Sequence, residues 1–442
     1  MHRNAGIQVR GDCWHIRGPL EFAGTFTPPG DKSLAHRALL LAALASGRCA
    51  LGNLPESEDV LRTRLGLESL GVPIAIDARA CRVRGVGLRG LTAAGDAIDC
   101  GNSGTTLRLL LGVLAAQSFP SELRGDASLS GRPMRRVVAP LRAMGAQVTC
   151  FGADERPPLA ITPGSRRLRG VDHQLSVDSA QVRSAILLAG VAAEGVTRIR
   201  PVSAARDHTE RMLRSLGVEM PRDPEGTTLV PVQVPWSAFS FAIPGDLSAV
   251  AFFAARTAAP PDALCASAVG LNPGRMRFVE ILADAGVEVT WEEQRSELCE
   301  PSGTLRVAGV MQRPLRIAGA DTVRCIDEIP ALLAGAVAAG VEARVEDAAE
   351  LRVKESDRVA AMTQLLRAFG AVVHESADAL HVEAGARLRA AHVHSRGDHR
   401  VAMAAAILAA ATPGDSVVDG VRCVRTSYPG FADDFSRLAR AR

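Results

Sequence analysis

Lysine is almost absent from this chain of 442 residues: only two of its 51 basic residues are lysines, and the other 49 are arginines (51 − 2 = 49). The two are Lys32, in the polar segment 29–33, and Lys354, in the polar segment 352–358. Arginine is a planar fork that is always protonated, whereas lysine is a compact point charge on a flexible stem. Keeping lysine at two polar turns indicates contacts with an anion. The alternative is codon bias with two chance survivors.

Aromatic residues are also scarce, at 4% of the chain, and the net charge is only +3. Few rings to stack on bases and no excess of positive charge argue against nucleic acid as a partner. The nine cysteines form no CxxC pair, so neither a zinc knuckle nor a disulfide framework is predicted. No apolar run of about 18 residues occurs, and the first residues do not read as a signal peptide. We therefore expect a cytoplasmic protein with no membrane partner.

What the sequence does contain is one unit repeated six times, in a chain long enough for two or three domains. Each unit begins with a short polar cluster that runs into an apolar helix rich in Ala and Leu. The six starts lie at residues 32, 103, 179, 246, 327 and 398. A second, amphipathic helix follows and ends at a glycine, as a left-handed C-cap requires, before a short β-like run. These glycines are residues 71, 145, 217, 286 and 370.

The sixth unit runs out at Arg442 within its second helix, and no strand is expected after it. The chain instead begins with spare β-like stretches, residues 7–10 and 13–16, which we expect to close the last unit. The sequence thus predicts an α/β protein of two lobes, with six βαβαββ-like units, three per lobe. One lobe comprises residues 27–238, and the other joins residues 1–26 to 239–442. A cleft between the lobes is the natural ligand site, and we expect the lobes to close on ligand.

The helix starts are rich in side chains that bind anions. A buried helix carries about half a positive charge at its N-terminus and presents backbone N–H groups there. The polar residues at these starts are Lys32, Ser33, Arg37, Asn102, Ser103, Thr105, Ser179, Gln181 and Arg400. Further basic residues lie in loop-like contexts at Arg132, Arg206, Arg358 and Arg425. Ordinary N-capping is the alternative, and it explains Ser179, Asp246 and Asp327 better than it explains the basic residues.

If several of these cations converge, the ligand carries phosphates or carboxylates. Two places could then move protons. Glu355 lies between Lys354 and Arg358, which favour its ionised form unless burial opposes them. Asp327 and Glu328 head an apolar helix, where Asp327 could also be only a cap. The sequence shows no P-loop, no Ser–His–Asp order and no cluster with metal-ligand spacing, so we expect no metal.

Nine motifs, in this order, make the chain resemble the 5-enolpyruvylshikimate-3-phosphate synthase family, the 3-phosphoshikimate 1-carboxyvinyltransferases. The resemblance covers residues 20–435. The motifs are PGDKSLAHRA (29–38), DCGNSGTTLRLL (99–110), GDASLSGRPM (125–134), SAQVRSAILLAG (179–190), RDHTERML (206–213), DEIPALLAG (327–335), ELRVKESDR (350–358), GDHRVAMA (397–404) and TSYPGF (426–431).

The resemblance implies transfer of the enolpyruvyl group of phosphoenolpyruvate to the 5-hydroxyl of shikimate 3-phosphate, with release of phosphate and no cofactor. It implies that shikimate 3-phosphate is bound by Lys32, Ser33, Arg37, Ser179, Gln181, Arg206, Asp327 and Lys354. Phosphoenolpyruvate would be bound by Lys32, Asn102, Gly104, Arg132, Gln181, Arg358, Arg400 and Arg425. The catalytic residues would be Asp327, which takes the hydroxyl proton, Glu355, which protonates the methylene carbon, and Lys32. The resembling enzymes also lead us to expect a monomer.

Three positions depart from the usual pattern of the family. Ala35 and Ala205 stand where the family mostly has Ser or Thr, and Arg425 stands where many members carry Lys. Ala35 is expected to face the interior of its repeat. Losing the hydroxyl at Ala205 and the lysine shape at Arg425 bears on affinity more than on reaction type.

Three other functions fit parts of the sequence. The sister enolpyruvyl transferase acting on UDP-N-acetylglucosamine typically carries a cysteine in the loop 125–131, which has none here. An RNA-end-processing enzyme of similar repeat architecture conflicts with the low net charge and few aromatics. A catalytically silent paralogue that only binds anions is disfavoured because Lys32, Asp327, Glu355 and Arg358 are all present.

Overall fold

The structure, a computed structural model, describes residues 6–77, 80–176, 178–201, 205–232 and 234–441. The chain divides into two compact units. Unit 1 comprises Met1–Pro29, Gly245–Arg295 and Pro301–Arg442, and unit 2 comprises Gly30–Pro244 and Ser296–Glu300. Each unit has a hydrophobic core of its own, built mainly from Ala, Leu, Val and Ile, with most of the buried phenylalanines in unit 1.

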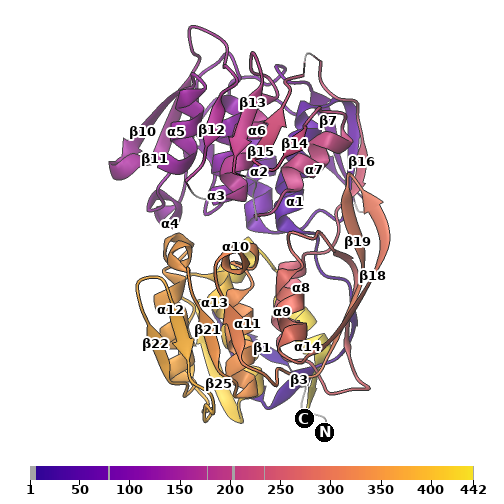
Figure 1. The fold of residues 1–442 in the computed structure, drawn as a ribbon, viewed down its shortest axis with the longest axis vertical. Helices are drawn as coiled ribbons and strands as arrows, with labels where there is room; N and C mark the ends of the chain where they lie inside the picture. Colours follow the sequence, from indigo (N-terminus) through magenta and orange to yellow (C-terminus); the bar gives the residue numbers. More distant parts are fainter. Residues whose placement is uncertain (1–5, 78–79, 177, 202–204, 233, 442) are drawn as a thin grey trace. The chain divides into compact units, whose positions relative to one another are not determined.

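Unit 2 contains the helices of the first three repeats (Figure 1). They are α1 (Lys32–Leu44), α2 (Glu58–Ser69), α3 (Gly104–Leu114), α4 (Ala127–Ser130), α5 (Arg135–Ala143), α6 (Ala180–Gly190) and α7 (His208–Ser215), with the 3-10 turn η1 (Ala153–Glu155). Its sheets run β16 (Ser240–Ala242), β5 (Ser46–Gly52), β7 (Cys81–Val86), β6 (Ile74–Ile76); β10 (Gln147–Gly152), β11 (Arg156–Thr162), β9 (Ser121–Arg124), β8 (Ile98–Asp99); and β12 (Asp172–Gln174), β13 (Thr197–Arg200), β15 (Gly226–Leu229), β14 (Arg222–Asp223).

Unit 1 contains the helices of the last three repeats. They are α8 (Leu247–Ala254), α9 (Arg277–Asp284), α10 (Ala320–Arg324), α11 (Ile329–Ala339), α12 (Arg358–Ala368), α13 (His399–Ala411) and α14 (Phe431–Leu438), with the 3-10 turns η2 (Ala349–Val353) and η3 (Val421–Thr426). Its sheets run β18 (Glu288–Glu297), β19 (Glu300–Ala308), β17 (Leu264–Gly270), β4 (Gly24–Phe26); β20 (Leu315–Ile317), β21 (Ala343–Val345), β23 (Leu380–Val382), β22 (Val373–Glu375); and β1 (Ile7–Arg10), β2 (Cys13–Gly18), β25 (Gly414–Asp419), β24 (His392–His394).

All six four-stranded sheets of the described residues follow one plan, which confirms the predicted α/β class and sixfold repeat. One edge strand pairs in parallel with its neighbour, and a hairpin completes the sheet, as in the β12–β13–β15–β14 sheet. The parallel pairs of the first and fourth repeats are β16 with β5 and β4 with β17. Unit 2 therefore extends through Pro244, because β16 completes the sheet that β5 begins.

The two helices of each repeat differ in burial as the sequence predicts. The first helices, α1, α3, α6, α8, α11 and α13, begin within two residues of the predicted starts, and their side chains are mostly buried. Ala35, on α1, is fully buried. The second helices are buried on one face, and each of the five predicted cap glycines has a positive φ, from +82° at Gly71 to +103° at Gly145. These positions favour glycine because a Cβ is strained at such angles.

The two ends of the chain meet in unit 1. As predicted, the N-terminal strands close the sixth repeat, since β2 pairs antiparallel with β25 from Cys13 to Gly18. The indigo N-terminal strands therefore lie among the yellow C-terminal elements in Figure 1. The prediction that no strand follows the last helix is wrong: β26 (Ala439–Ala441) pairs antiparallel with β3 (Leu20–Phe22). Without this pairing the backbone polar groups of β3 would lose their partners beside the buried Phe22.

None of the helices in the described part of the chain is long and apolar enough to cross a membrane.

Candidate anion-binding and catalytic clusters

Lys32 is the first residue of α1, and a carboxylate from the next helix holds its side chain. The N-cap Asp31 accepts a hydrogen bond from the backbone N–H of Leu34 at 2.9 Å, which fixes the start of the helix. Nζ of Lys32 lies 2.9 Å from Oδ2 of Asp59, in the first turn of α2, and the two side chains are 14% and 12% exposed. The sequence analysis missed Asp59, since only the packing of α2 on α1 brings it there.

Arg37, one turn further along α1, is buried with neutral hydrogen-bond acceptors. Its Nε donates to Oγ1 of Thr209 at 2.9 Å, NH2 to Oγ of Ser184 at 2.8 Å and NH1 to the backbone oxygen of Ser33 at 2.9 Å. Burial lowers the pKa of Arg37 to about 10, so the guanidinium stays charged at neutral pH. A buried charge bonded to neutral oxygens is suited to an anionic ligand.

Arg206 brings a second guanidinium to the same place. It lies just before α7, and its NH1 is 3.5 Å from Oγ of Ser33. Its charge is one of the effects that lower the pKa of Arg37, after burial, so the two guanidiniums are close. We call Lys32, Ser33, Arg37 and Arg206 the Lys32 cluster.

Gln181 and Arg108 join the starts of α6 and α3. Oε1 of Gln181 accepts a hydrogen bond from NH1 of Arg108 at 2.6 Å, and Nε2 of Gln181 donates to Oγ1 of Thr105 at 2.8 Å. Arg108 was not among the predicted site residues. Ser179 is the N-cap residue of α6, but its side chain makes no capping hydrogen bond, so capping does not explain it.

Two guanidiniums converge on Gly104, the first residue of α3. A Cβ at this glycine would lie 2.7 Å from NH1 of Arg108 and 3.2 Å from NH1 of Arg132. Arg132 is 8% exposed, and its NH2 donates to Oδ1 of Asn102 at 2.6 Å. Asn102, Gly104, Arg108, Arg132 and Gln181 together are the Gly104 cluster.

A buried chain of hydroxyls connects the starts of the first three helices. Nδ1 of His36 lies 2.6 Å from Oγ1 of Thr63, which lies 2.7 Å from Oγ1 of Thr106. The Thr106 hydroxyl also lies 2.8 Å from Oγ of Ser103 and 3.2 Å from the backbone oxygen of Asp59. Burial lowers the pKa of His36 well below its usual value, so the imidazole is neutral at neutral pH. This chain orders the helix starts that carry both clusters.

In unit 1, Arg358 gathers three carboxylates. Its side chain is 1% exposed, and Nε donates to Oδ2 of Asp398 at 2.8 Å. NH1 lies 3.4 Å from Oδ1 of Asp327, and NH2 donates to Oε2 of Glu355. Burial by itself opposes the charge, but Asp398, Glu355 and Asp327 outweigh it and raise the pKa of Arg358 above its usual value. Together with Arg400, these residues form the Arg358 cluster.

Asp327 lies between two guanidiniums. NH1 of Arg400, near the start of α13, donates to the backbone oxygen of Asp327 at 2.6 Å, and Nε of Arg400 lies 3.5 Å from Oδ1 of Asp327. The capping interpretation of Asp327 is wrong, because the N-cap of α11 is Glu328 and no side chain caps that helix. The true cap nearby is Asp398, whose Oδ1 accepts from the backbone N–H of Arg400 at 2.9 Å.

Lys354 follows η2 and stands within electrostatic reach of Asp327. Its Nζ lies 3.9 Å from Oε1 of Glu350, and its side chain is 27% exposed. Burial of the ammonium lowers the pKa of Lys354, while the charges of Asp327 and Glu350 oppose that lowering. An amine whose pKa is lowered can donate and accept a proton more readily than an ordinary lysine.

Arg425, the last of the predicted residues, is exposed on η3. Oγ1 of its neighbour Thr426 lies 3.4 Å from Nδ1 of His399, at the start of α13. Arg425 is thus near the helix that carries Arg400, but its part in the site stays a prediction.

A second buried ionic network, which the sequence analysis missed, adjoins Asp327. NH2 of Arg275 donates to Oγ of Ser248 at 2.6 Å and lies 3.1 Å from Oδ1 of Asp246 and 3.4 Å from Oε1 of Glu328. The Ser248 hydroxyl donates to the same Glu328 carboxylate. The network ties the start of α8 to the start of α11, where Asp327 lies. Its only sequence signal is the polar pairs at two predicted helix starts.

Among the residues that the structure describes, no group of three or more His, Cys, Asp or Glu side chains is arranged to hold a metal ion.

Comparisons with known proteins agree over nearly the whole chain. Residues 16–435 match the family described as EPSP synthase (3-phosphoshikimate 1-carboxyvinyltransferase). A 3-phosphoshikimate 1-carboxyvinyltransferase of Gloeobacter violaceus is 42% identical over 436 residues, covering 97% of this chain and 99% of the relative. The corresponding protein of Herpetosiphon aurantiacus is 40% identical over 421 residues, covering 95% and 97%.

Solved structures are also similar. An EPSP synthase of Acinetobacter baumannii is 36% identical with a TM-score of 0.84, covering 97% of this chain and 98% of that one. The enolpyruvyl transferase NikO of Streptomyces tendae has a TM-score of 0.76 at 16% identity, covering 96% and 97%, so it shows a shared fold alone.

Proposed function

The chain belongs to the EPSP synthase family, and we propose from this membership how its own residues carry out the reaction. The reaction is transfer of the enolpyruvyl group of phosphoenolpyruvate to the 5-hydroxyl of shikimate 3-phosphate, with release of phosphate. The observation that carries the proposal is the Arg358 cluster, in which one buried guanidinium contacts both Asp327 and Glu355. Two proton-transfer groups are thereby held beside one fixed positive charge.

The Lys32 cluster would bind the phosphate of shikimate 3-phosphate. Arg37 supports this role because its three hydrogen bonds end on neutral oxygens, which leaves its charge available to a phosphate. Arg206 and Ser33 would add a second guanidinium and a hydroxyl. Ser179 and Gln181 would complete this site, with Asp327 and Lys354 contacting the reacting part of the same substrate.

The Gly104 cluster would bind phosphoenolpyruvate together with basic residues of unit 1. The convergence of Arg108 and Arg132 on Gly104 supports this, because a residue without a side chain lets an anion approach both guanidiniums. The remaining residues proposed for this substrate are Lys32, Asn102, Gln181, Arg358, Arg400 and Arg425. Fixed cations would neutralise two polyanions that otherwise repel each other, and they would orient the hydroxyl towards the enol carbon.

In the proposed chemistry, Asp327 takes the proton of the 5-hydroxyl as its oxygen attacks C2 of phosphoenolpyruvate. Glu355, in its protonated form, gives a proton to the methylene carbon C3, and a tetrahedral adduct forms. Loss of phosphate from C2 and of one proton from the new methyl group to Glu355 then restores the double bond. The proton taken up by Asp327 leaves with phosphate or to water, so the proton count balances. Lys354, with its lowered pKa, would assist the proton transfer at Asp327.

We further propose that the enzyme works as a monomer in the cytoplasm. All nine cysteines are free thiols, which supports a reducing compartment. Size-exclusion chromatography with light scattering at micromolar concentration tests the oligomeric state, and a dimer would contradict the proposal.

Isosteric variants of the two carboxylates test the proposed roles. Asp327→Asn and Glu355→Gln should each lower kcat by about 10²–10⁴-fold in a phosphate-release assay, as loss of a positioned acid or base does. Glu346→Gln, an exposed carboxylate of unit 1, is the matched control and should stay near wild type. Assays with shikimate 3-phosphate, with UDP-N-acetylglucosamine and without acceptor identify the acceptor in the same experiment.

The two carboxylates can be told apart in deuterated buffer. Glu355→Gln should abolish deuterium incorporation at C3 of phosphoenolpyruvate, measured by NMR in the presence of shikimate 3-phosphate. Normal exchange in this variant would show that Glu355 is not the carbon acid.

A further inference from the structure

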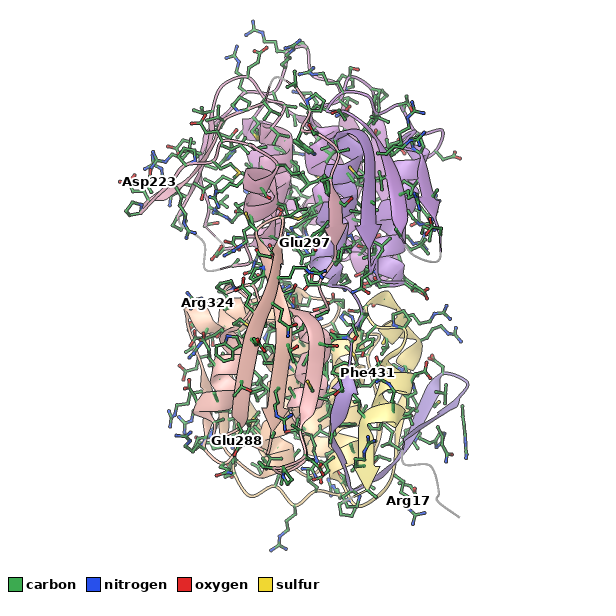
Figure 2. All side chains as sticks on the ribbon, turned by 90° about the vertical axis from the view of Figure 1, so that its right-hand side faces the viewer. Arg17, Asp223, Glu288, Glu297, Arg324 and Phe431 are labelled. Atoms are coloured by element: carbon green, nitrogen blue, oxygen red, sulfur yellow. The ribbon has the colours of Figure 1, made fainter. Side chains whose placement is uncertain are left out.

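The hairpin formed by β18 and β19 is unusual in this fold because its tip groups with the other unit. Its strands, ten and nine residues long, belong to the unit 1 sheet of β17 and β4. Figure 2 labels both ends of β18, Glu288 and Glu297. The tip, Ser296–Glu300, is part of unit 2, and Leu298 and Cys299 turn the chain there with φ of 48° and 59°. The sequence analysis did not predict this.

Contacts along the whole tip hold it in unit 2. The backbone N–H of Ala242 donates to Oε2 of Glu297 at 2.9 Å, and NH1 of Arg211 donates to the backbone oxygen of Cys299 at 3.1 Å. Leu298 packs against the unit 2 core. Both strands therefore end at a segment whose side chains and backbone are bonded to unit 2.

The strongest of these contacts is a buried pair. Nδ1 of His208 lies 2.8 Å from Oε1 of Glu300, and both side chains are only 1% exposed. Burying a carboxylate costs several kcal/mol in solvation, and a specific partner must offset that cost. Loss of either partner would therefore disturb the local structure, whereas an exposed ion pair could be lost with little effect.

His208 is the first residue of α7, and its neighbours are the phosphate-site residues. Thr209, the next residue, accepts the hydrogen bond from Nε of Arg37 at 2.9 Å and shares another with Ser184 at 2.7 Å. Arg206 lies two residues before His208. The charge of Glu300 also acts on Arg37, as one of the effects that oppose the lowering of its pKa by burial. One carboxylate thus fixes the helix start that supplies or orients both arginines.

We propose that Glu300 is a positioning residue for shikimate 3-phosphate, acting through His208 on Arg206 and Arg37. The inference rests on the proposed function, which assigns these arginines to the phosphate. Glu300 itself need not contact substrate. The phosphate site of unit 2 is then complete only while the tip of the β18–β19 hairpin is in place, so a segment carried by unit 1 strands governs one substrate's affinity.

The test compares binding of shikimate 3-phosphate, by calorimetry, with the two KM values. Glu300→Ala should weaken binding of shikimate 3-phosphate by about tenfold and raise its KM similarly, while the KM for phosphoenolpyruvate stays within about twofold. Glu300→Gln should recover most of the affinity, because the amide can bond His208 in either tautomer. Gln294→Ala, on the exposed part of the same hairpin, is the matched control and should bind normally.

Two further variants keep the inference falsifiable. If Glu300→Ala does not fold, Glu297→Ala loosens the tip from its exposed side and should weaken binding in the same direction by about two- to threefold. Arg206→Ala tests the proposed function itself. Normal binding by Glu300→Ala or Glu297→Ala, with weak binding by Arg206→Ala, would overturn the role of Glu300. Equal losses for both substrates would mean a general structural defect and would also overturn it. Normal binding by Arg206→Ala would instead refute the assignment of the phosphate site.

Discussion

At the scale of single residues, the two lysines differ from the 49 arginines by what surrounds them. Lys32 reaches Asp59 as a single point of charge at 2.9 Å, in a nearly buried place. Lys354 lies near Asp327 with a pKa that burial lowers. An arginine fits neither role, because its fork is larger and stays protonated at any working pH.

We therefore expect Lys32→Arg and Lys354→Arg each to lower kcat by about 10²-fold or more, a loss similar to that of other positioned groups. Steady-state phosphate release measures the effect, with circular dichroism as a check on folding. Arg316→Lys, on the exposed face of β20, is the control. Near-normal turnover in both variants would return the two lysines to codon bias.

The Arg275 network is a residue-scale feature with an effect on stability. Arg275 and Glu328 are almost completely buried, so removing one partner leaves an uncompensated charge in the interior. Arg275→Ala should lower the free energy of unfolding by about 3–5 kcal/mol, as breaking other buried pairs does. Arg277→Ala, two residues away and partly exposed, should lower it by about 1 kcal/mol or less. Equal losses in urea denaturation would show that burial of the network is not what matters.

At the scale of elements, one aspartate both starts α13 and holds Arg358. Asn caps a helix about as well as Asp, so Asp398→Asn should keep the helix start while removing the charge beside Arg358. We expect the KM for phosphoenolpyruvate to rise by about tenfold, with little change in helix content. Ser103→Ala is the contrasting variant, since it removes a neutral cap of α3 and should cost about 1 kcal/mol of stability. An unchanged KM in Asp398→Asn would remove Asp398 from the site.

The hydroxyl chain between α1, α2 and α3 predicts a pH dependence of stability. His36 is neutral in the folded protein because burial, and then Lys32 and Arg37, lower its pKa below the usual 6.5. As pH falls below 6.5 the unfolded chain binds a proton that the folded protein does not, so stability falls, by up to about 1.4 kcal/mol per pH unit. Above 6.5 this contribution is constant.

His36→Gln should flatten the slope of stability between pH 5 and 6.5, measured by urea denaturation at several pH values. His173 also has a pKa lowered by burial, so a smaller slope should remain, and His173→Gln is the matched control. A slope unchanged by His36→Gln would mean that the imidazole is not kept neutral by folding.

At the scale of the whole molecule, the two units have separate cores and separate sets of proposed ligands. Shikimate 3-phosphate at 100 times its Kd should stabilise the protein by about 2.7 kcal/mol. Because its phosphate is assigned to the Lys32 cluster, hydrogen exchange should slow most at the starts of α1, α6 and α7. Exchange in α9 should change little. Strongest protection in α9 would contradict the assignment of this substrate to unit 2.

The sequence by itself determined the repeat, the six buried helices, their starting residues and the glycines that end the second helices. These features are local: periodicity, caps and left-handed turns depend on residues within a few positions of one another. It also indicated the residues that make up the three clusters, apart from those it missed.

Only the tertiary structure decided which groups meet. Asp59 reaches Lys32 from 27 residues away, Gln181 reaches Arg108 from 73 and Glu300 reaches His208 from 92. Such pairs leave no pattern in the sequence, because their geometry is set by how helices and sheets pack and not by spacing along the chain. The same reason hid the tip of the β18–β19 hairpin and the pairing of β26 with β3.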